Sequence, residues 1–242
     1  MAGIRLDRFM GIDKWCRYEF AAGQISKDAQ VVDVGGGSGD FFRHMNVEGI
    51  VADKYVDSSR IARNRVQCQF VRFDGKRLPF QDSSVPVIIS LDVLEHLPPS
   101  DRGRFLAELR RVSGAKVVMS FPSDIQHFIR PLLAISRFHR IMGVRNVAEA
   151  NLMEHMACGL PKSAEVISDF EKCGWKVEAS QEFGLFHSLF MICQWTMPFL
   201  AFKSVNILVS RLTKKGRRRK PSYLYLVAHK DSIRESVGFQ MR

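Results

Sequence analysis

The chain has 242 residues, of which 46% are hydrophobic and 25% charged, so disordered and collagen-like classes are excluded and one large domain with its own core is possible. The formal net charge is +11, but the segment 203–220 holds eight basic residues and no acidic one, which leaves +3 for the remainder. The main body of the chain is therefore only mildly basic.

The cysteines argue against a disulfide framework and against a structural zinc site. They are odd in number, scattered and never spaced as Cys-x-x-Cys, which fits a reducing cytosol. They are Cys16, Cys68, Cys158, Cys173 and Cys193. The cysteine spacing thus leads us to expect no bound metal. The N-terminal stretch "MAGIRLDRFMGIDKW" has no uninterrupted apolar run, so we also expect no secretory signal and a cytoplasmic protein.

Four short apolar runs near the N-terminus predict strands, and each has an aspartate at or beside its end. The runs are "QVVDV", "GIVAD", "QFVRFD" and "VIISLD", with the aspartates Asp33, Asp53, Asp74 and Asp92. The aspartates are 20, 21 and 18 residues apart, which is too long for hairpins and typical of strand–helix–strand units.

Three further strands and two helices complete the pattern. The strands are 115–122, 175–180 and 222–229, and the helices are 99–112 and 162–174. Ser100 or Asp101 is the expected N-cap of the first helix, and Gly174 the C-cap of the second. This order predicts an α/β fold with a doubly wound, mostly parallel seven-stranded sheet, forming a single domain over 1–242.

Such sheets bind ligands in the crevice at the carboxyl ends of their parallel strands, where all four aspartates fall. A single aspartate there is commonly a residue that turns the chain into a loop. Four at successive strand ends, the first beside a glycine-rich loop, predict a binding site instead.

The stretch "VVDVGGGSGDF" at 31–41 places four glycines within five positions directly after the first strand. A dinucleotide fold would need a third glycine where Asp40 stands, and a carboxylate there would repel a pyrophosphate. A P-loop would need Lys-Ser/Thr after the glycines, where the sequence has Asp40-Phe41. We infer that the ligand carries no phosphate at this point.

The spacing that fits is Asp-x-Gly-x-Gly-x-Gly, formed by Asp33, Gly35, Gly37 and Gly39. With "VADK", "FDGKRLPFQDSS" and "IISLDVLEHL", this motif resembles the class I S-adenosylmethionine-dependent methyltransferases, in particular the type-11 group that acts on small molecules and lipids. The resemblance covers 29–122 well and 160–183 more loosely. The fourth strand departs from the family pattern, because Val85-Pro86 stands where Phe-Asp is common; a proline is tolerable at a strand start.

The resemblance implies the cofactor S-adenosylmethionine and a role for each matching residue. Asp33 and the glycines of the motif would hold the methionine portion, and Asp53 would accept both ribose hydroxyls. Asp74 would meet the adenine amino group, and the Gly75 amide would reach the ring. Asp92 would either bind the methionine end or cap the following turn. A cationic sulfonium nucleoside also suits a crevice rimmed with carboxylates.

Methyl transfer needs alignment above all, and a general base only where the acceptor arrives protonated. His96, just after the fourth strand, is the candidate catalytic residue, as a base or as part of the acceptor wall; packing in a loop is the other interpretation. A solvent-facing position is the stronger expectation for Glu95. His127 and His155 lie in an insertion between the fifth and sixth strands.

That insertion, 123–160, has apolar residues at helical spacing with arginines among them, which fits either a lid over the acceptor or a helix packed on the core. A second insertion, 183–220, lies between the sixth and seventh strands. Its first twenty residues contain no Asp, Glu, Lys or Arg and a single histidine, His187, but a single membrane span would separate the last strand from its sheet. We favour an interfacial segment over core or dimer packing.

The basic residues that follow would then contact anionic lipid headgroups. They are Lys214, Lys215, Arg217, Arg218, Arg219 and Lys220. No aromatic residues alternate with them to stack on bases, so nucleic acid is not the expected partner.

The sequence thus predicts methyl transfer from S-adenosylmethionine to a small-molecule, lipid or lipid-linked glycan acceptor, in the cytoplasm and peripheral to a membrane. An RNA or protein methyltransferase is the alternative within the same chemistry, although "SLDVLEHL" stands where Asn/Asp-Pro-Pro-aromatic marks amino methylation of nucleic acids. A non-catalytic scaffold that binds the cofactor and a dinucleotide-binding reductase are the alternatives from other classes.

Overall fold

The computed structural model describes residues 12–26, 28–55, 68–74, 76–123, 158–182 and 223–230. The predictions for Gly75, for His127 and His155, and for the basic run after 203 fall outside these residues, as do almost all of both insertions.

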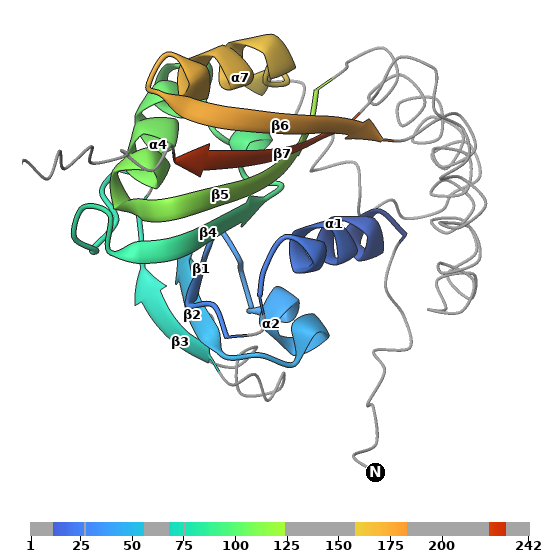
Figure 1. Cartoon of the computed structure of the whole chain (residues 1–242), viewed down its shortest axis with the longest axis vertical. Coiled ribbons are helices and arrows are strands. Elements are labelled where there is room, and N and C mark those ends of the chain that lie inside the picture. Colours follow the sequence, from blue (N-terminus) through green and yellow to red (C-terminus); the bar gives the residue numbers. More distant parts are fainter. Residues whose placement is uncertain are drawn as a thin grey trace, which may run out of the picture.

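Seven strands form one sheet in the order β3-β2-β1-β4-β5-β7-β6 (Figure 1). The strands are β1 (Val31–Val34), β2 (Gly49–Asp53), β3 (Cys68–Arg72), β4 (Val85–Leu91), β5 (Ser113–Pro122), β6 (Trp175–Glu182) and β7 (Tyr223–Lys230). The first five in sheet order pair in parallel, and β7 is antiparallel to both β5 and β6. The predicted doubly wound, mostly parallel α/β sheet is confirmed.

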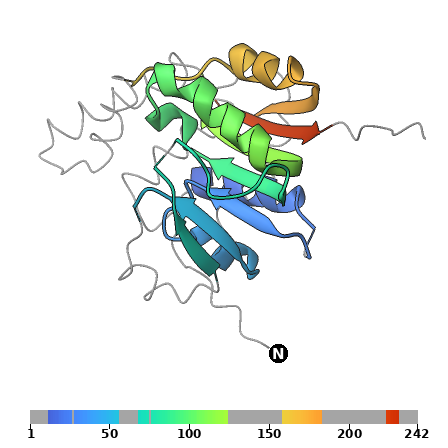
Figure 2. The ribbon, with the colours of Figure 1, turned by 90° about the vertical axis from the view of Figure 1, so that its left-hand side faces the viewer.

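Helices cover both faces of the sheet (Figures 1 and 2). One face carries α1 (Ile12–Gly23) and α2 (Asp40–Met45), and the other carries α4 (Pro99–Val112) and α7 (Ser163–Glu171); a short 3-10 helix, η1 (Leu94–His96), follows β4. The alternation of side chains along each strand separates two cores. In β1, Val32 and Val34 pack with the α4 and α7 residues, whereas Val31 packs with Trp15 and Phe41.

Two local predictions need correction and one is explained. α4 begins at Pro99 with Pro98 as its N-cap and has no side-chain cap, so neither Ser100 nor Asp101 has that role; a proline at the first helical position needs no donor. Gly174 has φ +78° as a C-terminal glycine should, but α7 ends earlier, at Glu171, and the Gly174 amide closes the turn onto its carbonyl. Pro86 lies at a shift in the β4–β5 register, where a missing amide donor is tolerated.

Candidate functional site

The loop between β1 and α2 can only be built from glycine at three positions. Gly35, Gly37 and Gly39 have φ values of +82°, +57° and +75°, a region that side chains rarely adopt. The Gly35 amide donates to the Ala52 carbonyl at 2.8 Å, which ties the loop to the end of β2. A Cβ at Gly35 would also overlap the Val93 side chain. The glycine loop (residues 35–39) therefore lies tightly between the ends of β2 and β4.

Asp33 lies beneath this loop and is almost fully buried, with 3% of its surface exposed. A Cβ on Gly36 would overlap its carboxyl group, so the loop backbone closes directly over the side chain. Burial, together with the nearby charges of Asp53 and Asp40, raises the pKa of Asp33 to about 8, and Lys14 offsets this only in part. A cation placed at the loop would stabilise the ionised form of this carboxyl.

Asp53, the last residue of β2, presents its carboxylate beside the loop. Its Oδ2 accepts the Gly37 amide at 2.8 Å, and its Oδ1 accepts the Tyr55 amide at 2.8 Å. These two donors fix the plane of the carboxylate, and each oxygen keeps a lone pair for a further donor. A pair of adjacent hydroxyls is therefore a suitable ligand for Asp53.

Asp74 follows β3 and is exposed, with its Oδ1 accepting the Lys76 amide at 3.0 Å. The Phe73 amide donates to the Asp53 carbonyl at 2.9 Å, so the ends of β2 and β3 are held together. The structure thus brings Asp33, Asp53 and Asp74 to neighbouring strand ends, as predicted.

Asp92 follows β4 in a left-handed conformation, with φ +56°. Its amide donates to the Ser120 carbonyl at 2.9 Å, and its carboxylate forms an ion pair with Arg17 of α1. No side chain caps η1, so the alternative role of Asp92 as the cap of this turn is wrong.

The helix α1 was not predicted from the sequence, yet it contacts both sides of the site. Lys14 pairs with Asp40 at the start of α2, and Arg17 reaches Asp92 after β4. The hydrogen bond from Lys14 keeps the pKa of Asp40 below its usual range, although burial pushes it upward. Tyr18 packs edge-on against Phe41 at a centroid distance of 5.6 Å. Only the periodic aromatic residues of 12–23 could have indicated the helix.

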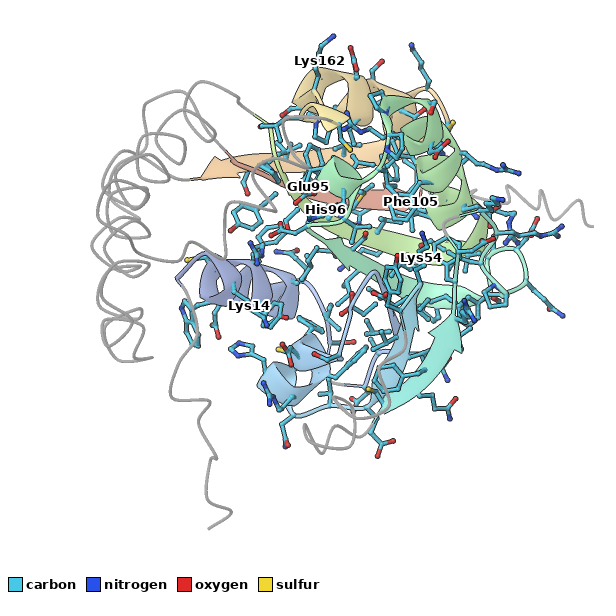
Figure 3. The ribbon with its side chains drawn as sticks, turned by 180° about the vertical axis from the view of Figure 1, so that it is seen from behind. Lys14, Lys54, Glu95, His96, Phe105 and Lys162 are labelled. Atoms are coloured by element: carbon cyan, nitrogen blue, oxygen red, sulfur yellow. The ribbon has the colours of Figure 1, made fainter. Side chains whose placement is uncertain are left out.

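Glu95 contradicts the prediction of a solvent-facing side chain. Only 1% of it is exposed, and its Oε2 has no hydrogen-bond partner among the described residues. Burial, and next the negative charge of Asp92, raise the pKa of Glu95 well above its usual range, against the opposing charges of Arg17 and Arg102. His96, beside it, is half-buried. Figure 3 shows the two residues next to one another, at the end of the sheet where α1 and its Lys14 also lie.

Arg102 of α4 connects η1 to the end of the first insertion. Its Nε donates to the carbonyls of Leu94 and Leu97 at 3.2 and 3.1 Å. Its Nη2 donates to the carbonyls of Cys158 and Gly159. The chain that returns from the insertion is thereby held beside Glu95 and His96.

Elsewhere in the described part of the chain, function could also depend on a second pocket, a metal site, a membrane-spanning helix or a disulfide. A hollow of about 880 Å³ lies at the amino ends of the strands, lined by residues such as Gln30, Gly49 and Pro86, which is the edge opposite the glycine loop. Among the described residues, no three His, Cys, Asp or Glu side chains are grouped to hold a metal ion. No described helix is both long and apolar enough to cross a bilayer. Four of the five cysteines are described, and none of these four forms a disulfide.

Comparisons with known proteins agree with this geometry. Residues 32–119 match a family model described as a methyltransferase domain. An uncharacterized methyltransferase of Mycobacterium sp. (strain KMS) is 33% identical over 132 residues, which cover 48% of this chain and 51% of the relative. The chain thus spans about half the length of this curated relative.

Two more distant proteins extend the likeness. The ubiquinone/menaquinone biosynthesis C-methyltransferase UbiE of Xylella fastidiosa (strain M12) is 21% identical over 69% of this chain and 76% of its own length. The structure of Haemonchus contortus phosphoethanolamine N-methyltransferase 2, in complex with S-adenosyl-L-methionine, superposes with a TM-score of 0.58 and 15% identity, over 95% of this chain and 55% of that one.

Proposed function

We propose that the chain is a class I S-adenosylmethionine-dependent methyltransferase, which binds S-adenosylmethionine and transfers a methyl group to a small-molecule, lipid or lipid-linked glycan acceptor. The observation that carries this proposal is the Asp53 carboxylate, held by two backbone amides beside a glycine loop that closes over the buried Asp33. A ribose diol offers the two donors that this carboxylate can accept in parallel.

The remaining residues fit the same ligand. Asp33 and the glycine loop would hold the methionine portion, where the ammonium group would favour the ionised carboxyl. Asp74, exposed beyond β3, would accept the adenine amino group, with the Gly75 amide next to it. Asp92 would lie at the methionine end, oriented by Arg17. The bound cofactor would supply a methyl group on a positively charged sulfur, which an acceptor atom displaces in line.

The acceptor class is inferred from the relatives and from the basic segment. The relatives named above act, by their names, in quinone biosynthesis and on phosphoethanolamine, and both kinds of acceptor are small or lipid-related. The apolar stretch 183–202 and the basic run behind it would keep the enzyme at the cytoplasmic face of a membrane, as a peripheral protein.

Calorimetric titration with S-adenosylmethionine and S-adenosylhomocysteine tests the cofactor assignment. We expect micromolar binding, and a loss of roughly 100-fold in Asp53→Ala, because two hydrogen bonds to a charged group disappear. Asp28→Ala, the same change on an exposed aspartate at the opposite edge, should bind as the wild type does. Binding of NAD in place of either nucleoside would show that the glycine loop serves a reductase.

Transfer of label from methyl-tritiated S-adenosylmethionine tests the reaction. Label in the lipid or small-molecule fraction of a cell extract supports the proposal, and label confined to RNA or protein supports the alternative acceptors. Cofactor binding without transfer to any fraction would identify a scaffold.

Flotation with anionic vesicles tests the location. Binding that falls with salt and is lost when Arg217, Arg218 and Arg219 are replaced by glutamine would agree with a membrane-surface role. Equal flotation with and without vesicles would contradict it.

A further inference from the structure

Glu95 is a buried acid, and one of its two carboxyl oxygens lacks a hydrogen-bond partner among the described residues. Its side chain is 1% exposed, and its Oε2 has no hydrogen-bond partner in the described part of the chain. A buried polar atom without a partner costs free energy, so native proteins leave few of them, and a catalytic role is one of the recognised reasons for those that remain. Glu95 therefore needs an explanation beyond packing.

The position of Glu95 relates it to the proposed active site. Val93, two residues earlier, packs against Gly35 of the glycine loop, and Asp92 is the carboxylate that Arg17 holds. On its other side, Arg102 binds the η1 carbonyl of Leu94 and the carbonyls at the end of the first insertion. Glu95 thus lies between the cofactor loop and the segment that returns from the insertion.

The charges near Glu95 come from three elements. Asp92 disfavours its ionised form, whereas Arg17 of α1 and Arg102 of α4 favour it. The Arg102 guanidinium donates to four backbone carbonyls, and Arg17 forms its ion pair with Asp92. Among the described residues, no cation forms an ion pair with Glu95 itself. The half-buried His96 is its neighbour in η1.

The cofactor's own donors leave Glu95 unused. In the proposed binding mode, the ribose hydroxyls belong to Asp53, the ammonium to the loop above Asp33, and the adenine amino group to Asp74. A donor on the acceptor molecule is then the group that Oε2 can accept. A free amine attacks with its lone pair and a ring carbon with its π electrons, and each loses a proton only after the methyl group has arrived, whereas a hydroxyl must lose its proton as it attacks.

We propose that Glu95 accepts the proton of an acceptor hydroxyl, so that the product of this protein is a methyl ether. This inference rests on the proposed methyl transfer. As the oxygen–methyl bond forms, the sulfur–methyl bond breaks, the hydroxyl proton passes to the Glu95 carboxylate, and neutral S-adenosylhomocysteine leaves. Glu95 later releases the proton to water. Burial and the charge of Asp92 raise the pKa of Glu95, which makes its carboxylate a stronger proton acceptor than an exposed one.

Glu95→Gln tests the role while keeping the shape of the side chain. Methyl-tritiated S-adenosylmethionine is incubated with a lipid and metabolite extract of the source organism and with the wild type, Glu95→Gln, His96→Gln or Glu171→Gln. The last variant makes the same change on an exposed residue of α7. Cofactor affinity is measured for each by calorimetry, and the labelled product is treated with hydriodic acid, which releases the methyl group of an ether as methyl iodide.

The expected result has four parts. Glu95→Gln lowers the transfer rate by about 100-fold or more, which is what a lost general base costs, with cofactor affinity within twofold of the wild type. Glu171→Gln transfers normally. The wild-type rate rises with pH through one ionisation, and the residual rate of Glu95→Gln does not. The label of the wild-type product is released as methyl iodide.

Other outcomes overturn the inference in distinguishable ways. Equal rates for Glu95→Gln and the wild type, or label that stays bound to carbon, remove Glu95 from the reaction while methyl transfer itself stands. Loss of the pH dependence in His96→Gln alone assigns the proton to His96. No transfer by a wild type that binds the cofactor removes the proposed function, and this role with it. Because a neutral amide replaces a buried carboxyl, Glu95→Gln should melt no lower than the wild type, which separates a catalytic defect from misfolding.

Discussion

The buried Asp33 makes a specific prediction about how stability depends on pH. Its pKa is about 8 in the folded protein and 3.8 in its ordinary environment, so the folded state holds a proton that the unfolded state releases. Asp33→Asn keeps the size and the hydrogen-bonding surface of the side chain but cannot titrate. The two proteins should therefore respond differently to pH.

The magnitude follows from the two pKa values. Below pH 3.8 the carboxyl is protonated in both states and burial costs little. As the pH rises from 3.8 to about 8, the unfolded state is favoured by about 1.4 kcal/mol for each pH unit, and above 8 the loss levels off. Between pH 5 and pH 8 the apoprotein should thus lose about 3–4 kcal/mol of unfolding free energy through Asp33 alone. That is a large part of the stability of an ordinary domain.

Urea denaturation of the apoprotein at pH 5, 6, 7 and 8 measures this effect. The difference in unfolding free energy between Asp33→Asn and the wild type cancels all other titrations, and it should grow in favour of the variant by about 3–4 kcal/mol across the range. Asp28→Asn, on the exposed opposite edge, should show no such growth. A difference that stays constant within about 1 kcal/mol would mean that Asp33 is ionised in the folded state and that the argument from its burial is wrong.

Two further predictions concern packing and can be checked by thermal melts. Gly36→Ala should lower the free energy of unfolding by about 1–3 kcal/mol, because its Cβ would overlap the carboxyl below, and should weaken cofactor binding. Gly103→Ala, in the interior of α4 with open space around the added methyl group, should instead raise the free energy of unfolding by about 0.5–1 kcal/mol. Equal effects of the two changes would contradict the close approach at Gly36. Arg102→Ala should lower the free energy of unfolding by about 3 kcal/mol, because it leaves four carbonyls without this donor. Arg104→Ala, which changes an exposed arginine of the same helix, should leave the free energy of unfolding almost unchanged. A melting temperature of Arg102→Ala equal to that of Arg104→Ala would show that water replaces the guanidinium.

The sheet and the line of aspartates could be predicted because both follow from local patterns. A strand that ends in an aspartate about every twenty residues leaves room for one crossover segment, and parallel pairing then brings all the carboxyl ends to one edge. The left-handed glycines at 35, 37 and 39 are equally local, because only a residue without Cβ adopts those backbone angles cheaply. Pro86 is a partial exception: its tolerance was predictable, but not the bulge that accommodates it.

The contacts of α1 and the burial of Glu95 depend on tertiary structure and could not be predicted in this way. Lys14 and Arg17 look like solvent-facing charges of a surface helix, and nothing in 12–23 says that their partners are Asp40 and Asp92, more than twenty residues away. Glu95 follows the same rule, since glutamate is rarely fully buried, and the sequence around it gives no sign of the exception.

Two buried acids, Asp33 and Glu95, both destabilise the protein as long as nothing binds near them. A fold selected for stability alone would replace either with an amide or an apolar residue, and strongly perturbed acids are commonest where a ligand or a reaction needs them. Different charged residues also act on the pKa of each acid. Asp40 and Asp53, on the side of the glycine loop, act on Asp33, whereas Asp92 and Arg102, toward the insertion, act on Glu95. The ammonium of S-adenosylmethionine can relieve Asp33, and its sulfonium can favour an ionised Glu95 by charge alone, but a sulfonium has no proton to donate to the unpartnered Oε2. The missing hydrogen bond therefore requires a second molecule, and this is the physical reason for looking for the acceptor at Glu95.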